Sequence, residues 1–152
     1  MKLIVDNIPR DFEPMETTSP FILNVGPLYR RTTEDQTLLG LLVEEQHCNS
    51  RGRLHGAMVC AVADIALGQN VGRLFAENGA FEDSEGVLLP GVGMATVSMS
   101  TDFAGTARVG HWVEAHVDVQ RAGKRMAFAN AYLVRGEERI ARVSGVYQII
   151  TK

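Results

Sequence analysis

Hydrophobic positions follow two different periods along this chain. From Ala57 onward, small apolar residues occur on every side of a helical wheel, interrupted near the middle by one carboxylate, Asp64. An apolar run of this length between loop signals predicts a helix from Gly56 to Asn78 that is buried on all sides. No Lys, Arg or His lies three or four residues from Asp64, so no ion pair can form within the helix.

Polar and apolar residues alternate after that helix, which predicts β-strands. The links between the last three strands are short enough for hairpins, so an antiparallel four-strand meander is expected. Along the first strand, strict alternation places Thr96 and Ser98 on the face opposite Met99. The expected strands are residues 93–103, 112–120, 126–135 and 139–150.

The part of the chain before the helix carries weaker signals. The first 20 residues hold three of the five prolines and are expected to be irregular or partly helical. Phe21–Arg31 alternates loosely and predicts a strand with a break at Gly26-Pro27, and Thr37–Gln46 predicts a second strand. We therefore expect one domain, with residues 1–35 as an N-terminal lead-in plus first strand, and residues 36–152 as its main part.

These elements restrict the architecture. A helix that is apolar on all sides cannot lie on an open sheet face without leaving apolar surface in water. The sheet must curl around the helix, or a second subunit must cover it. The fold class expected is α+β, with a curved antiparallel sheet wrapped around one long central helix.

Composition excludes several kinds of partner. With 152 residues, 45% of them hydrophobic, the chain is long enough for one globular core. A net charge of −3 gives no reason to expect nucleic acid as a partner. Asp64 interrupts the longest apolar run, so no membrane-spanning helix and no membrane partner are expected. The first apolar run is three residues, too short for a secretion signal, and the protein is expected to be cytoplasmic.

The cysteines and histidines give little indication of a disulfide, a nucleophile or a metal site. Cys48 and Cys60 do not make a disulfide framework, and nothing marks Cys48 as an activated nucleophile. No Cys/His set has the spacing of zinc ligands, so no metal site is expected. We expect the three histidines outside the helix start to be surface or strand residues: His47, His111 and His116.

One group of residues resembles a known family. Asn49, His55-Gly56 and Asp64, at these spacings and in this order of elements, resemble the hotdog-fold acyl-CoA thioesterases. More closely, they look like the phenylacetate-pathway (PaaI-like) branch of the 4-hydroxybenzoyl-CoA thioesterase superfamily. That branch carries a second glycine after His-Gly, where this chain has Ala57. The resemblance covers roughly residues 36–150.

The resemblance implies hydrolysis of an acyl-CoA thioester to free acid and CoA. Coenzyme A is then part of the substrate, and no separate cofactor is implied. Asp64 would activate water or attack the carbonyl directly, while Asn49 and His55 would orient the carbonyl or the water. Thr96 matches a hydroxyl that in some relatives helps to place the water, with Ser98 as its substitute. The family also implies a homodimer or homotetramer with sites between subunits.

The start of the helix has the physical properties needed to bind a carbonyl oxygen. The amide of Gly56 is free of helical hydrogen bonding, and the positive end of the helix dipole lies there. Asp64 lies eight residues further along, roughly 12 Å at the helical rise, which is too far to share one thioester. Two antiparallel helices across a dimer axis could bring Gly56 of one chain near Asp64 of the other.

Other assignments stay open at this point. Arg121, Lys124 and Arg125 are the best cluster for the phosphates of coenzyme A, although a solvated hairpin tip explains them equally well. Asp64 could instead face solvent or bind a backbone amide. A non-catalytic acyl-CoA-binding hotdog protein is the main alternative function, and the spacing of His55 and Asp64 does not match a hotdog hydratase. The acyl group is not determined; short aromatic and medium-chain groups both remain open.

Overall fold

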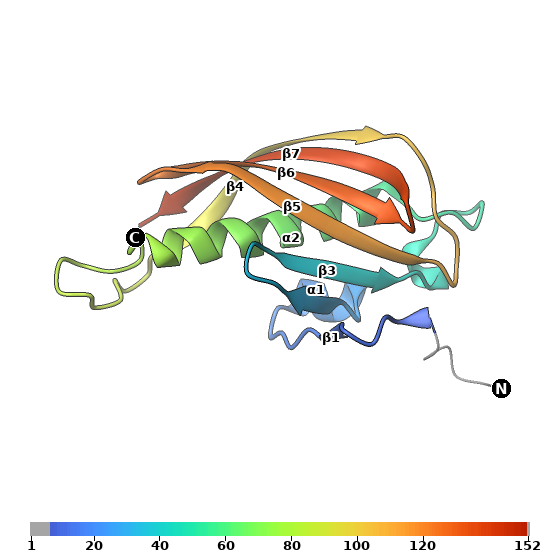
Figure 1. Cartoon of the computed structure of the whole chain (residues 1–152), viewed down its shortest axis with the longest axis horizontal. Coiled ribbons are helices and arrows are strands. Elements are labelled where there is room, and N and C mark those ends of the chain that lie inside the picture. The colour runs from blue at the N-terminus through green and yellow to red at the C-terminus, as the bar shows by residue number, and fades with distance from the viewer. Residues whose placement is uncertain (1–6, 152) are drawn as a thin grey trace.

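A curved seven-stranded sheet covers one side of a long helix, α2 (Gly56–Glu77), in the computed structural model, which describes residues 7–151 (Figure 1). All strand pairs are antiparallel, in the order β1-β2-β3-β5-β6-β7-β4. The α+β class, with a curved sheet around one central helix, is confirmed. The other elements are β1 (Glu13–Pro14), α1 (Pro20–Val25), β2 (Tyr29–Thr32), β3 (Thr37–Leu42), a 3₁₀ turn (Glu45–His47), β4 (Gly93–Phe103), β5 (Trp112–Ala122), β6 (Met126–Arg135) and β7 (Glu138–Ile150).

The predicted four-strand meander is wrong in one respect. β5, β6 and β7 do form a meander, but β4 pairs with β7 at the far edge of the sheet and not with β5. The link between β4 and β5 crosses the end of the sheet. There the amides of Ala104 and Gly105 donate hydrogen bonds to the carbonyl of Ile140 at the start of β7. β4 is therefore an edge strand, with one side unpaired among the described residues.

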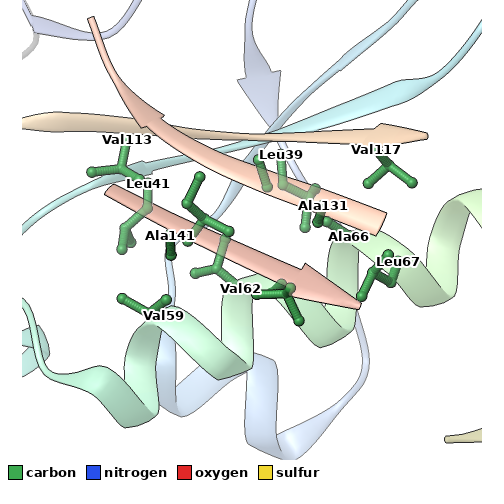
Figure 2. Packing of buried hydrophobic residues seen from close by; sticks show 14 of the residues in the cluster. Leu39, Leu41, Val59, Val62, Ala66, Leu67, Val113, Val117, Ala131 and Ala141 are labelled. Atoms are coloured by element: carbon green, nitrogen blue, oxygen red, sulfur yellow. The ribbon is translucent and has the colours of Figure 1, made fainter. Parts of the chain in front are cut away.

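Helix α2 buries one broad face against the concave side of the sheet (Figure 2). Val59, Val62, Ala66 and Leu67 pack there against residues from several strands. The predicted start at Gly56 is confirmed, and Asn78 is the C-cap. The strand residues labelled in Figure 2 are Leu39, Leu41, Val113, Val117, Ala131 and Ala141.

The prediction that the helix is buried on all sides is wrong for the single chain. Cys60, Asp64 and Gly68 lie one turn apart on a half-buried row of α2 that faces β4. A single sheet covers only part of a helix circumference, so this row stays accessible beside the sheet edge. It is the side on which another molecule could reach α2.

The strand predicted over Phe21–Arg31 is wrong before its break at Gly26-Pro27, where α1 forms, and is confirmed after it, where β2 begins at Tyr29. Pro20 occupies the first turn of α1, and the Ser19 hydroxyl accepts a hydrogen bond from the Ile22 amide, so two start signals act together. Next along the chain, β2 extends the sheet beside β3. The ring of Phe12 packs edge-on against Trp112, with centroids 5.0 Å apart. Residues before the main sheet thus cover part of its outer face.

Within the described residues, no helix combines the length and the apolar character needed to cross a bilayer.

Candidate active site

The loop before α2 is held in shape by Asn49. Its Oδ1 accepts hydrogen bonds from the amides of Arg51 (2.9 Å) and Arg53 (3.2 Å), and Cys48 and Leu54 close the loop as an antiparallel bridge. This is the side-chain-to-backbone bonding that favours asparagine in turns. Asn49 therefore shapes the loop, and its Nδ2 group is the part left to meet a ligand.

His55 is the N-cap of α2. Its Nδ1 accepts a hydrogen bond from the Ala57 amide at 2.9 Å, which satisfies one of the free donors of the first turn. Nδ1 is thus an acceptor, and the neutral ring carries its proton on Nε2. The ring borders an apolar hollow of about 280 Å³, which Phe21 and Met58 also line.

Gly56 borders a different hollow, of about 370 Å³, which Asn49, Arg51 and Phe103 also line. No hydrogen bond among the described residues uses the Gly56 amide. A Cβ at this position would lie 3.2 Å from the Phe103 ring, so glycine lets that ring approach the helix start. The structure brings Asn49 and Gly56 to one hollow, while His55 faces another.

Asp64 is half-buried, although the sequence placed it in a helix buried on all sides, and its carboxylate is hydrogen-bonded to residues outside the helix. Its Oδ1 accepts hydrogen bonds from Thr96 Oγ1 and from the Tyr147 hydroxyl, each at 2.8 Å. These donors lie 32 and 83 residues away in sequence. The residue pattern of the helix therefore gives no indication of either donor.

Thr96 reaches Asp64 because β4 contains a bulge. The register runs from Thr96–Tyr147 to Ser98–Val146, so Val97 is an extra residue. After the bulge, Met99 packs on the core side, and Thr96 faces the same side. The predicted placement of Thr96 opposite Met99 is therefore wrong. Ser98 shares the outward face of its partner Val146, which removes it as a substitute at Asp64.

Tyr147 was missed by the sequence analysis. It is 1% exposed and lies on β7, on the face toward α2. Burial, followed by its hydrogen bond to Asp64 and the negative charge there, raises the pKa of the phenol well above its usual value. In the sequence, Tyr147 is marked only by its position in the alternating pattern of the last strand. That pattern predicts which face the ring occupies but not its hydrogen bond to Asp64.

The basic cluster of Arg121, Lys124 and Arg125 lies away from the start of α2. Arg121 and Lys124 line a hollow with Asn78 and Gly79, at the C-terminal end of α2. Gly56 is at the other end of this 22-residue helix, roughly 33 Å away at the helical rise. Arg125 follows in the same hairpin. Within one chain the cluster is remote from Gly56, and its role toward the phosphates of coenzyme A stays a prediction.

His47 is not the surface or strand residue that we predicted. It is 2% exposed, its Nδ1 accepts from the Glu44 amide, and its Nε2 donates to the Val25 carbonyl at 2.7 Å. It thereby links α1 to the turn before the site loop. Among residues 7–151, no three His, Cys, Asp or Glu side chains gather as a metal would require.

Comparison with known proteins identifies the family. The family described as "Thioesterase superfamily" matches residues 51–141. The Pseudomonas aeruginosa protein named "Putative esterase PA0474" is 37% identical over 144 residues, covering 94% of this chain and 98% of that protein. The chain belongs to the thioesterase superfamily. The match includes α2 with Gly56 and Asp64, and β4 with Thr96. It begins two residues after Asn49 and ends four residues into β7, before Tyr147.

Solved structures confirm the hotdog fold, and one of them is a PaaI protein. The Escherichia coli PaaI protein from the phenylacetic acid degradation operon aligns with a TM-score of 0.66 at 18% identity, covering 88% of this chain and 86% of that chain. The BH2602 protein of Bacillus halodurans, solved with CoA, aligns with a TM-score of 0.65 at 18% identity, covering 81% and 74%. At these identities the likeness concerns the fold.

Proposed function

We propose that this member of the superfamily hydrolyses acyl-CoA thioesters to a free acid and CoA. The observation that carries the proposal is the Asp64 carboxylate, which two hydroxyls hold on the accessible row of α2. The unused amide of Gly56 at the helix start supplies a donor for a carbonyl oxygen. Coenzyme A enters as part of the substrate.

The chemistry needs a base or nucleophile and an oxyanion donor. Asp64 takes a proton from water, and the water oxygen bonds to the thioester carbon while the carbonyl electron pair moves onto oxygen. The Gly56 amide stabilises that oxyanion. When it collapses, the C–S bond breaks, and the CoA thiolate leaves and takes the proton from Asp64. In a second route, Asp64 attacks the carbon itself, the C–S bond breaks, and the CoA thiolate leaves behind an anhydride. Water then hydrolyses the anhydride, which releases the acid, restores the Asp64 carboxylate and supplies the proton that the thiolate takes up.

Two chains are needed to assemble this site. Gly56 and Asp64 lie on one helix, eight residues or roughly 12 Å apart along its axis. The Asp64 row faces β4, whose outer edge is unpaired among the described strands. A second copy joined at that edge would place its α2 antiparallel beside this one, so that Asp64 meets the partner subunit's Gly56. A homodimer, alone or within a homotetramer, is therefore proposed.

Cysteine cross-linking checks this arrangement. If Gly56 faces the partner's Asp64, the midpoint Cys60 lies near its own copy at the two-fold axis. Helix axes 8–10 Å apart bring facing Cα atoms to about 3.5–5.5 Å, which overlaps the separation that a disulfide spans. Mild oxidation is expected to give a disulfide-linked dimer on a non-reducing gel. The product should persist in Cys48→Ser and disappear in Cys60→Ser; a dimer in solution that never links through Cys60 contradicts the arrangement.

Release of free thiol from a panel of acyl-CoAs tests the activity. The panel contains phenylacetyl-CoA, hydroxybenzoyl-CoA, and short and medium straight-chain acyl-CoAs, since the acyl group is open. We expect turnover of one class well above the uncatalysed rate. Tight binding of acyl-CoA without thiol release from any member would contradict the proposal and favour a non-catalytic binding protein.

A further inference from the structure

Both hydroxyl donors at Asp64 act on the same oxygen. Thr96 Oγ1 and the Tyr147 hydroxyl each donate to Oδ1 at 2.8 Å. No hydrogen bond to Oδ2 occurs among the described residues, and the half-buried side chain keeps it accessible from the row of α2 that faces β4. The carboxylate is therefore anchored through one oxygen and open at the other.

The Tyr147 ring has its place because Gly145 lacks a side chain. Gly145 lies two residues before Tyr147 and so faces the same side of β7. A Cβ on Gly145 would lie 2.8 Å from Cε2 of the Tyr147 ring and 3.0 Å from Cδ1 of Leu67. The ring therefore lies over the space at Gly145, between β7 and α2, and its hydroxyl is directed at Asp64.

The backbone places the second donor beside the first. Thr96 and Tyr147 are register partners across β4 and β7, just before the bulge at Val97. Directly opposed residues in an antiparallel pair share a face, so this register places both hydroxyls on the side of the sheet where Asp64 lies. The raised pKa of the Tyr147 phenol keeps its proton in place across neutral pH, so it serves as a donor throughout.

We propose that Tyr147 is a positioning residue of the active site, which with Thr96 fixes Oδ1 of Asp64 and leaves Oδ2 as the reacting oxygen. The inference rests on the proposed function and deepens it. In either chemical route, Oδ2 takes the proton from water or forms the bond to the acyl carbon. A carboxylate free to rotate would spend less time in that geometry, and small misplacements of reacting groups cost large factors in rate.

The test removes each hydroxyl and keeps the shape of its side chain. Tyr147→Phe and Thr96→Val are expected to lower kcat about 10- to 100-fold. KM should stay within about two-fold, because neither hydroxyl contacts the substrate in this scheme. Tyr132→Phe is the matched control: Tyr132 is half-buried, carries Arg139 over its ring at 4.1 Å, and should leave kcat unchanged.

A spectroscopic readout checks the contact without catalysis. A buried hydroxyl bonded to a carboxylate is expected to give a downfield ¹H resonance, absent from Tyr147→Phe and shifted upfield in Asp64→Asn. A lower kcat with unchanged KM, together with that response, supports the proposal. If the wild type is active and Tyr147→Phe leaves kcat unchanged, the positioning role of Tyr147 is overturned while the proposed function stands. A wild type that hydrolyses no thioester overturns the proposed function, and with it the catalytic use of this contact.

Discussion

Replacing Asp64 by asparagine is expected to lower kcat for thioester hydrolysis about 1,000-fold, within the range that a general base contributes. An amide can neither take a proton from water nor attack a thioester, while its shape matches that of the carboxylate. Its oxygen can still accept from Thr96 and Tyr147, so the packing between α2 and the sheet should be kept. The measurement is thiol release at saturating acyl-CoA, with circular dichroism and gel filtration to check fold and assembly.

The matched control is Asp118→Asn, which makes the same change in charge. Asp118 is exposed on β5, where its Oδ2 accepts from Gln120 Nε2 at 2.9 Å. The kcat of Asp118→Asn should equal that of the wild type. If Asp64→Asn and the wild type turn over acyl-CoA equally fast, Asp64 has no part in the mechanism.

The second large effect concerns stability. Asn70→Asp is expected to lower the free energy of unfolding by about 3–5 kcal/mol, the range found when one partner of a buried charged pair is lost. Asn70 is 4% exposed and joins α2 to the start of β3. Its Nδ2 donates to the carbonyls of Thr37 and Ala66, and its Oδ1 accepts from the Thr37 amide, all at 2.8 Å. Aspartate keeps the acceptor, loses both donors, and sets a buried negative charge against two carbonyl oxygens.

Urea unfolding at neutral pH measures this difference, with Asn130→Asp as the control. Asn130 is half-buried on β6, and its Oδ1 accepts from Ser144 Oγ at 2.8 Å, which a carboxylate can do equally well. The control should change the unfolding free energy by no more than about 0.5 kcal/mol. Equal losses in the two variants would show that the contacts of Asn70 do not decide the effect.

Features that depend on neighbouring residues were predictable. The long apolar run predicted α2 to within a residue at each end, because the loop before it and Asn78-Gly79 after it are local signals. Alternation located β5, β6 and β7, since the period of a strand is also local. The spacing of Asn49, His55-Gly56 and Asp64 indicated the family, which the match over residues 51–141 bears out.

Features that depend on distant pairing were missed or misplaced. One bulge at Val97 moved Thr96 to the opposite face, because a single extra residue reverses every later side chain in a strand. The position of β4 at the sheet edge followed from hydrogen bonds between residues 104–105 and Ile140, which no local pattern records. Helix α1 replaced the first half of the strand expected over residues 21–31, although Ser19 and Pro20 were visible start signals.

The sequence by itself determined the fold class, the central helix and the position of Asp64 along it, because these follow from periodicity and spacing within a short window. Only the tertiary structure decided what Asp64 touches. Its two donors come from strands 32 and 83 residues away, and their meeting depends on strand register and on the space at Gly145. Register is a property of two strands together, so no single segment of the chain contains it.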